Sequence, residues 1–428
     1  MSYGMAAGTN NLNFYTMPRQ ETGGGREIAD IEVIQEHFTK LEKGRDYEIL
    51  QQNPHVTSQR NVEDFFIFIN PRKGDELRSI KAPHWRTISE ENVDTKLLIG
   101  EKEIPYYEVN TKGAGYLKRS AKGKNFNRMS TWVQEDATGQ QRLGYKVLGL
   151  SSLHEYENGD IISRSEKLVE NGLRAEVYWA VGKVKQLPYK GKLQTIEQLK
   201  KKEIILDNPE YEPAMAVRIM RTNDRIEEAA RSHERRKEIF EKAFSIFNKE
   251  TRDRGLSHPE LVIGDSSHER RFFRVFFRRM GENMAILLNL GMADYYMHSS
   301  NITMAAEIAD IGSITHWRED KEETLTEKYG GVRKGHIKDM RDMMYALRML
   351  INAGKVQGLA AGTRERLKEA FFHGFDKVVD SQKVKGEDTD PQKAREWMGI
   401  IFDTVIIHKE GLPSLQHYDI EDWPIRLL

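Results

Sequence analysis

Hydrophobic and polar residues alternate along several stretches of the first half of the chain, and this period of two predicts β-strands. The stretches with this alternation, or with a short apolar run between turn residues, are 64–70, 95–100, 104–113, 142–150, 160–164, 202–207 and 214–221. In the same half, apolar residues recur every three or four positions at 28–44 and 165–187, which predicts two helices. Ser165 has the side chain of a helix N-cap and marks the predicted start of the second helix.

The second half of the chain has helical spacing almost throughout. Helices are predicted at 224–255, 266–291, 337–354, 363–382 and 391–409. A β-rich half followed by a helical half predicts an α+β fold with two lobes and a cleft between them. We place an N-terminal arm at 1–60, the β-rich lobe at 61–215 and the helical lobe at 216–428.

The composition narrows the class of protein. The chain of 428 residues can bury a large core, and its 66 basic and 66 acidic residues cancel, so no overall charge favours nucleic acid or a membrane surface. The chain has no cysteine, which excludes disulfides, thiolate nucleophiles and cysteine-based metal sites. No apolar run approaches the ~18 residues of a membrane-spanning helix, and the first residues do not resemble a signal peptide. We therefore expect a cytoplasmic protein.

Candidate metal ligands lie in the segment 291–313, GMADYYMHSSNITMAAEIADIGS. NITM and EIAD predict two short strands around a tight Ala-Ala turn, with Asn301 opening the first strand and Asp310 closing the second. Kinase-like phosphotransferases hold Mg²⁺ with an Asn and an Asp in a similar arrangement, because Mg²⁺ prefers oxygen ligands. The alternative is that Asn301 and Asp310 only form turns at strand ends, as Asn and Asp commonly do.

A lysine and two glycines follow another predicted strand. Lys112 precedes Gly113 and, after an alanine, Gly115. In a β-rich lobe such a lysine reaches nucleotide phosphates and pairs with a helical glutamate. Glu170 and Glu176, on the predicted helix that follows, are the candidate partners. A solvated lysine beside a flexible glycine turn is the alternative.

Arginines are the third candidate feature. Arg218 lies inside the apolar run of the predicted strand 214–221, and Arg221 and Arg225 follow it. An unpaired charge in such a run is costly, so Arg218 requires an anionic partner. Arginine binds phosphate through two parallel hydrogen bonds and stays charged, which suits nucleotide binding. The sequence leaves open whether that partner is a phosphate or a carboxylate of the protein.

Together these features resemble the selenoprotein O family of protein AMPylating enzymes, which have a pseudokinase fold. The resemblance extends from about residue 80 to residue 315, and its motifs occur in the same order. In the segment 291–313 the family pattern is matched at Gly291, Met297, Asn301, Glu307, Asp310 and Gly312. The other matches are 97–101, 112–115, 175–182 and the pair Arg218 and Arg225.

The resemblance implies a protein-kinase-like fold in which ATP is inverted, so that AMP is transferred to a hydroxyl group. By analogy, the nucleotide site contains Lys112 with the glycines after it, Glu170 or Glu176, Arg218 and Arg225. Asn301 and Asp310 would then bind Mg²⁺ or Mn²⁺.

The sequence also departs from the family pattern. Ser300 stands where the family has its catalytic-loop Asp, and serine is a poor general base at neutral pH. His298 and Asp294 are the nearby groups that can replace the base, although neither is a positional match. The family's glycine-rich phosphate loop corresponds to 91–96, which contains no glycine.

Three functions therefore remain as hypotheses. The first is a Mg²⁺- and ATP-dependent nucleotidyltransferase that moves AMP to a hydroxyl of a protein or a small molecule. The second is a kinase-like phosphotransferase, or an enzyme that activates a small molecule with ATP. The third is an inactive pseudokinase that binds nucleotide and acts as an interaction protein. Partners other than ATP and the acceptor are not indicated, and neither a membrane nor nucleic acid is expected.

Overall fold

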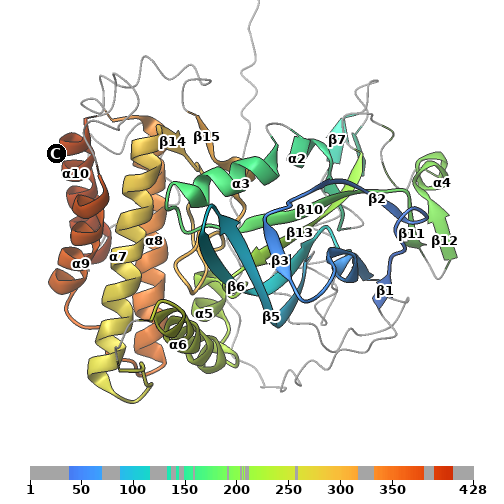
Figure 1. The fold of residues 1–428 in the computed structure, drawn as a ribbon. Coiled ribbons are helices and arrows are strands. Elements are labelled where there is room, and N and C mark those ends of the chain that lie inside the picture. Colours follow the sequence, from blue (N-terminus) through green and yellow to red (C-terminus); the bar gives the residue numbers. More distant parts are fainter. Residues whose placement is uncertain are drawn as a thin grey trace, which may run out of the picture. The chain divides into compact units, whose positions relative to one another are not determined.

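An antiparallel sheet and a group of helices make up the part of the chain that the computed structural model describes (Figure 1). The described residues are 38–69, 87–115, 133–135, 141–143, 149–157, 160–189, 192–202, 205, 207, 212–255, 259–316, 332–379 and 390–407. They form a mixed α+β fold with a curled sheet. The predicted α+β class is therefore confirmed.

The main sheet has the strand order β2-β10-β13-β6-β5-β3, and β9 also pairs with β13. Its strands are β2 (Tyr47–Gln52), β3 (Val56–Ser58), β5 (Thr87–Ile99), β6 (Lys102–Lys112), β9 (Ser151–Ser152), β10 (Val177–Val184) and β13 (Pro213–Met220). Every residue of β13 is buried, so this strand lies at the centre of the core. Irregular register in β5 and β10 is typical of a sheet that bends.

Short elements surround the main sheet. The two-stranded pairs are β1 (Phe38–Lys40) with β4 (Ile67–Ile69), β7 (Val133–Glu135) with β8 (Gln141–Leu143), β11 (Gln186–Tyr189) with β12 (Lys192–Thr195), and β14 (Met292–Ala293) with β15 (Thr315–His316). The short helices are α2 (His154–Glu157), α4 (Ile196–Lys201) and the 3₁₀ turns η2 (Val62–Phe65) and η5 (Ile311–Ser313). Helix α3 (Ile161–Glu170) packs along β10 on the sheet (Figure 1).

Helix α5 is short, and the other helices of the second half are longer. In chain order these helices are α5 (Ile226–Arg231), α6 (Arg236–Asp253), α7 (Ser266–Leu290), α8 (Lys334–Val356), α9 (Arg364–Val378) and α10 (Pro391–Phe402), with a π-helical turn η8 (Asp403–Ile407) at the end. Helices α7 and α9 lie side by side (Figure 1). At Gly281 a Cβ atom would lie 2.0 Å from the carbonyl oxygen of Phe371, so glycine permits this close packing. Within the described ranges, no helix is both long and apolar enough to cross a membrane.

Several predicted elements are confirmed. Strands β5, β6 and β13 cover 95–100, 104–113 and 214–221 closely, and helices α7 to α10 occupy the four last helical predictions. The predicted helix 224–255 is interrupted at 232–235, between α5 and α6. The prediction for 202–207 lies mostly outside the described residues, as do 28–37 and 144–148.

Other predictions are wrong. The predicted strand 160–164 and helix 165–187 are instead helix α3, capped by Asp160 rather than Ser165, followed by strands β10 and β11. The helix ends because Gly172 adopts a φ of +94°, a conformation that favours glycine. Strand β10 is buried on both faces, so it lacks the alternation of a half-buried strand. Residues 38–44 form β1 and a turn and are not helical.

Part of the predicted N-terminal arm contributes to the sheet. Strand β2 pairs with β10 and strand β3 pairs with β5, although both precede residue 60. The stretch 47–58 is therefore structurally continuous with the β-rich region.

Candidate functional site

Five polar residues from distant parts of the sequence converge where the sheet meets the segment before β15. We call them the Glu176 cluster: Asn110, Lys112, Glu176, Arg218 and Asp310. Arg218 Nη1 donates to Glu176 Oε2 at 2.7 Å, and its Nε and Nη2 donate to Asn110 Oδ1 at 2.9 and 2.6 Å. The anionic partner that the sequence requires for Arg218 is thus a carboxylate of the protein.

Glu176 also holds the backbone around Asp310. Its Oε1 accepts hydrogen bonds from the N–H groups of Asp310, at 2.9 Å, and Ile311, at 3.3 Å. The N–H of Glu176 in turn donates to the carbonyl of Ile308 at 3.0 Å. These contacts hold Asp310 at a φ of +63°, a conformation that non-glycine residues seldom adopt and that is common at functional sites.

Lys112 and Asp310 form an ion pair between residues 198 positions apart in the sequence. The Lys112 side chain is 9% exposed and that of Asp310 is 45% exposed, so the pair faces solvent through its carboxylate. Lys112 ends β6, and its backbone lies opposite Ala216 of the central strand β13. The structure therefore brings together the predicted phosphate-binding lysine and the predicted metal-binding aspartate.

The two predicted glutamate partners of Lys112 lie elsewhere. Glu170 is exposed at the end of α3, and Glu176 lies after that helix, not on it. Glu176 joins the cluster through Arg218 and the Asp310 backbone, whereas the ammonium group of Lys112 binds Asp310. The prediction that a helical glutamate pairs with Lys112 is wrong, because the predicted helix ends before Glu176.

The glycines after Lys112 have a structural reason to be present. Gly113 adopts a φ of +83° and Gly115 a φ of +98°. A Cβ atom on Gly113 would lie 2.8 Å from the carbonyl oxygen of Ala214 and 2.9 Å from the amide nitrogen of Ser151. Glycine thus lets the chain pass close to β9 and β13.

Arg225 is buried beside the cluster without full hydrogen bonding. It is 2% exposed, and its Nη2 reaches Asn223 Oδ1 at 3.4 Å. Its Nε and Nη1 groups have no hydrogen-bond partner in the part of the chain that the structure describes. Burial lowers the pKa of Arg225, and the positive charge of Arg218 lowers it further. A buried cation with unpaired donors is destabilising by itself, and this makes Arg225 a candidate for anion binding.

The segment around Asn301 folds as a tight turn. The chain reverses at Ala306, with a φ of +60°, and an isolated bridge joins Ile302 to Ile308. The N–H of Ala309 donates to the carbonyl of Asn301 at 2.8 Å, which places Asn301 next to the Asp310 loop. The predicted turn is confirmed, but single bridges replace the two predicted strands.

Ser300 and His298 form a hydrogen-bonded pair. Ser300 Oγ lies 2.7 Å from His298 Nδ1. Burial lowers the pKa of His298 below its usual value, so the imidazole is neutral at pH 7. Burial makes the imidazole a weaker base than usual, but its neutral form has a free lone pair for a proton, so His298 is still a better general base than the Ser300 hydroxyl.

Asp294 is fully buried and separated from solvent. Its Oδ1 accepts a hydrogen bond from Ser313 Oγ at 2.5 Å, and its N–H donates to Asp339 Oδ2 at 2.7 Å. Burial raises the pKa of Asp294 to about 7, although the Ser313 hydrogen bond opposes this shift. These contacts show Asp294 in a structural position, where it holds the loop before Asn301.

The sequence does not predict a second set of buried charged residues that the structure contains. Glu250 of α6 forms ion pairs with Arg174, Arg221 and Arg279, and Arg221 also pairs with Glu307 at 2.6 Å. Burial alone would raise the pKa of Glu250, but the three arginines lower it strongly. The sequence gives no signal for this set beyond arginines in apolar runs, because its members are far apart in the chain.

Asn301 and Asp310 are suited to a magnesium ion by their chemistry. Both offer oxygen ligands, and Asn301 uses its Nδ2 to donate to the Tyr296 carbonyl, at 3.1 Å. Among the described residues there is no group of three or more His, Asp or Glu side chains that could hold a metal by itself. A metal here would therefore need further ligands from a nucleotide or water.

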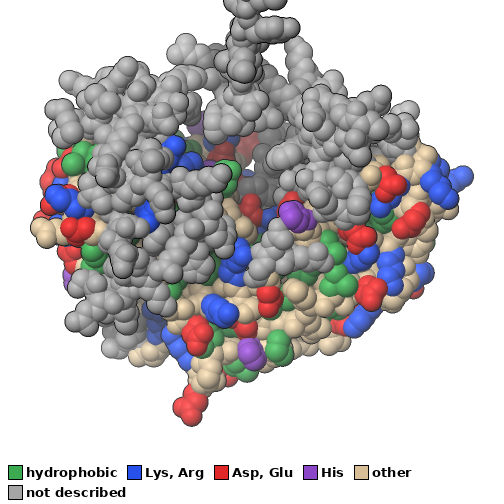
Figure 2. Space-filling view, turned by 90° about the horizontal axis from the view of Figure 1, so that it is seen from above, with side chains coloured by type: hydrophobic (Ala, Val, Ile, Leu, Met, Phe, Trp, Pro, Cys, Tyr) green, Lys and Arg blue, Asp and Glu red, His purple; other side chains and the backbone are tan. Residues whose placement is uncertain are grey.

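Searches of protein-family models and of curated protein sequences found no match for this chain. The surface gives little further indication of a partner. On the face shown in Figure 2, Lys and Arg side chains are mixed with Asp and Glu side chains over the described residues. The described residues on this face thus show no continuous basic area of the kind that binds a nucleic acid backbone.

Proposed function

We propose that the protein is a Mg²⁺- and ATP-dependent transferase with a kinase-like two-lobe fold, which moves AMP from ATP to a hydroxyl acceptor. The observation that supports it most is the ion pair of Lys112 and Asp310 with Arg225 as an electrostatic neighbour, two of whose donors are unpaired among the described residues. A strand that ends in lysine, a helix, two further strands, and then an Asn and an Asp loop is also the order of parts in kinases.

Arg225 would bind a phosphate group. The guanidinium is planar and its donors have fixed directions, so its unpaired Nε and Nη1 groups can donate to phosphate oxygens without rearrangement of the group itself. Arg218 has a different task, because Glu176 and Asn110 already occupy its donors. It positions Glu176, which holds the Asp310 loop. Lys112 would exchange the Asp310 carboxylate for a phosphate oxygen when the nucleotide enters.

Asn301 and Asp310 would hold the metal. When bound, Mg²⁺ or Mn²⁺ neutralises phosphate charge and orients the nucleotide. The half-exposed carboxylate of Asp310 is the better ligand of the pair, because it carries the charge.

His298 would take the proton of the acceptor hydroxyl, and Ser300 would orient the imidazole. In the proposed step the acceptor oxygen bonds to the α-phosphorus, and the bond between that phosphorus and its bridging oxygen breaks. Pyrophosphate leaves with the electron pair, and the hydroxyl proton goes to His298. This assignment places the base two residues before the position of the family's aspartate.

A second candidate function is nucleotide binding without turnover. It is favoured by the ion pair between Lys112 and Asp310, which occupies the carboxylate that a metal would need, and by the absence of an aspartate at position 300. Such a protein would act through its interactions with partners.

One experiment tests these proposals. The protein is incubated with Mg²⁺ and ATP labelled at the α- or the γ-phosphate, with binding measured in parallel. Label retained only from α-labelled ATP supports AMP transfer, label from γ-labelled ATP supports a kinase, and binding alone supports the second candidate.

A substitution tests the metal site. Asp310→Ala should abolish turnover. Asp376→Ala is the matched control, since Asp376 is also 45% exposed and ion-paired, with Arg395. If Asp310→Ala has the same turnover as the control, the proposal that Asp310 binds the metal is wrong.

A further inference from the structure

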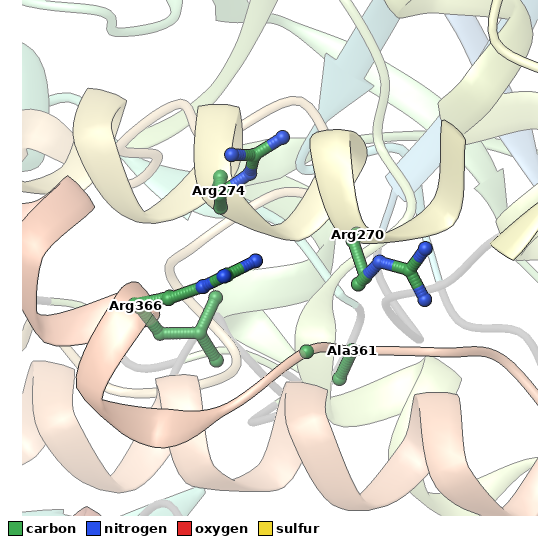
Figure 3. A pocket seen from close by; sticks show the side chains of 6 residues that line it. Arg270, Arg274, Ala361 and Arg366 are labelled. Atoms are coloured by element: carbon green, nitrogen blue, oxygen red, sulfur yellow. The ribbon is translucent and has the colours of Figure 1, made fainter. Parts of the chain in front are cut away.

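A small pocket between α7 and α9 is lined by three arginines. Figure 3 shows Arg270 and Arg274 on α7, and Arg366 extends from the start of α9 between α7 and the loop that carries Ala361. The accessible volume is about 30 Å³, and the pocket is open to solvent. Space of this size admits about two water molecules, or part of one small anion.

These arginines have no carboxylate partner within the described part of the chain. None of them takes part in an ion pair or a side-chain hydrogen bond there. Two acids, one next to Arg270 in the sequence and one at the start of α7, have other partners. Glu269 accepts from the N–H groups of Gly264 and Ala360, and Asp265 caps α7. Asp265 attracts Arg270 only at longer range, so no described carboxylate forms an ion pair with the pocket.

In a second, larger cavity the basic side chains do form ion pairs. It has a volume of about 300 Å³ and is also lined by cations, including Lys183, Lys185 and Lys200. Each of these lysines forms an ion pair with a carboxylate, and so does Arg45. The cations of the larger cavity are thus satisfied by the protein, in contrast to the three arginines.

The placement of Arg366 is also unfavourable for its own helix. Thr363 caps α9 and accepts the N–H of Arg366, so Arg366 lies in the first turn. Helix N-termini carry partial positive charge, and cations in the first turn are destabilising there. Arg364 lies in the same turn, and only Glu365 opposes the two charges. Such a local conflict is expected where a ligand compensates for it.

We propose that the Arg270, Arg274 and Arg366 pocket binds the phosphate group of a small phosphorylated ligand. A dianionic phosphate offers oxygens to several guanidinium groups at once, which matches three arginines around one small volume. A nucleic acid would need a longer row of cations to follow its backbone. The site is separate from the Glu176 cluster and does not depend on the function proposed for it.

Inorganic phosphate is the probe for a test on the full chain. Its binding is measured by calorimetry and by the shift of the thermal midpoint, against chloride at equal ionic strength. The variants are Arg274→Gln and Arg366→Gln. The matched control is Arg271→Gln, which removes an arginine from the same helix without touching the pocket.

We expect saturable binding to the wild type and to the control. Each pocket variant should weaken phosphate binding at least about tenfold, because it removes one charge-assisted hydrogen bond. In chloride, Arg366→Gln should leave the thermal midpoint unchanged or raise it, since it removes a cation from the first turn of α9. Equal phosphate affinity in all variants would overturn the proposal. So would a fall of the Arg366→Gln midpoint in chloride, or binding of single-stranded oligonucleotides that both pocket variants abolish.

Discussion

The substitution Glu176→Gln examines how the Glu176 cluster holds the candidate site. Glu176 is fully buried, and its carboxylate accepts from Arg218 at 2.7 Å and from the N–H groups of Asp310 and Ile311. Glutamine has the same shape, but only one of its two terminal atoms accepts hydrogen bonds. It must therefore give up either Arg218 or the Asp310 backbone. Removing one partner of a buried ion pair costs about 3–5 kcal/mol, because the other charge remains buried.

The free energy of unfolding in urea measures this cost. Asp376→Asn is the control, because the exposed pair of Asp376 and Arg395 is screened and should lose less than about 1 kcal/mol. Arg218→Met alone should also be costly, yet the double variant Glu176→Gln with Arg218→Met should lose less than the sum of the two. Hydrogen exchange should become faster at residues 310 and 311 in Glu176→Gln. Additive losses, or a loss no larger than in the control, would refute the reasoning.

Three further predictions concern burial, titration and backbone conformation. Arg225→Met should leave the ligand-free protein equally or more stable and weaken Mg²⁺-ATP binding about tenfold or more, whereas Arg221→Met, which removes a paired cation, should destabilise it in urea. The pKa of Asp294 is raised to about 7 in the folded state, so its contribution to stability is full below about pH 4 and is lost as the pH rises through 7. Asp294→Asn should remove this decline from unfolding curves measured between pH 5 and 8. Gly113→Ala should lower the thermal midpoint more than Gly44→Ala, because both glycines have a φ near +85° but only Gly113 is enclosed by backbone atoms.

The parts of the fold that the sequence predicts well are those whose pattern is local. In α7 the apolar residues repeat at helical spacing, with Asp265 before the first turn and Gly291 after the last. Strand β10 could not be recognised in the same way. It is paired with β2 on one edge and β13 on the other, α3 packs along it, and nearly all its residues are buried, so the sequence VYWAVGKV carries no alternation. A short apolar run of this kind is compatible with a helix or a strand until its neighbours are known.

The same limit applies to the candidate site. Lys112, Asn301 and Asp310 could be identified as candidate site residues, since each stands beside a recognisable turn or strand end. Their partners could not. Pairing of Lys112 with Asp310, and of Arg218 with Glu176, depends on contacts between distant segments that no local pattern encodes.

What separates a structural arginine from a candidate binding residue is how its donors are satisfied, not how deeply it is buried. Arg218, Arg221 and Arg225 are all at most 5% exposed and lie within eight residues of one another. The first two meet carboxylates at 2.7 and 2.6 Å, and these contacts account for their burial. Among the described residues Arg225 donates only to an amide oxygen at 3.4 Å, although the negative charges of Glu176, Asp310 and Glu228 partly offset its own. Because a desolvated cation with incompletely paired donors lowers stability, Arg225 is the residue at which the proposed phosphate binding can be tested most directly.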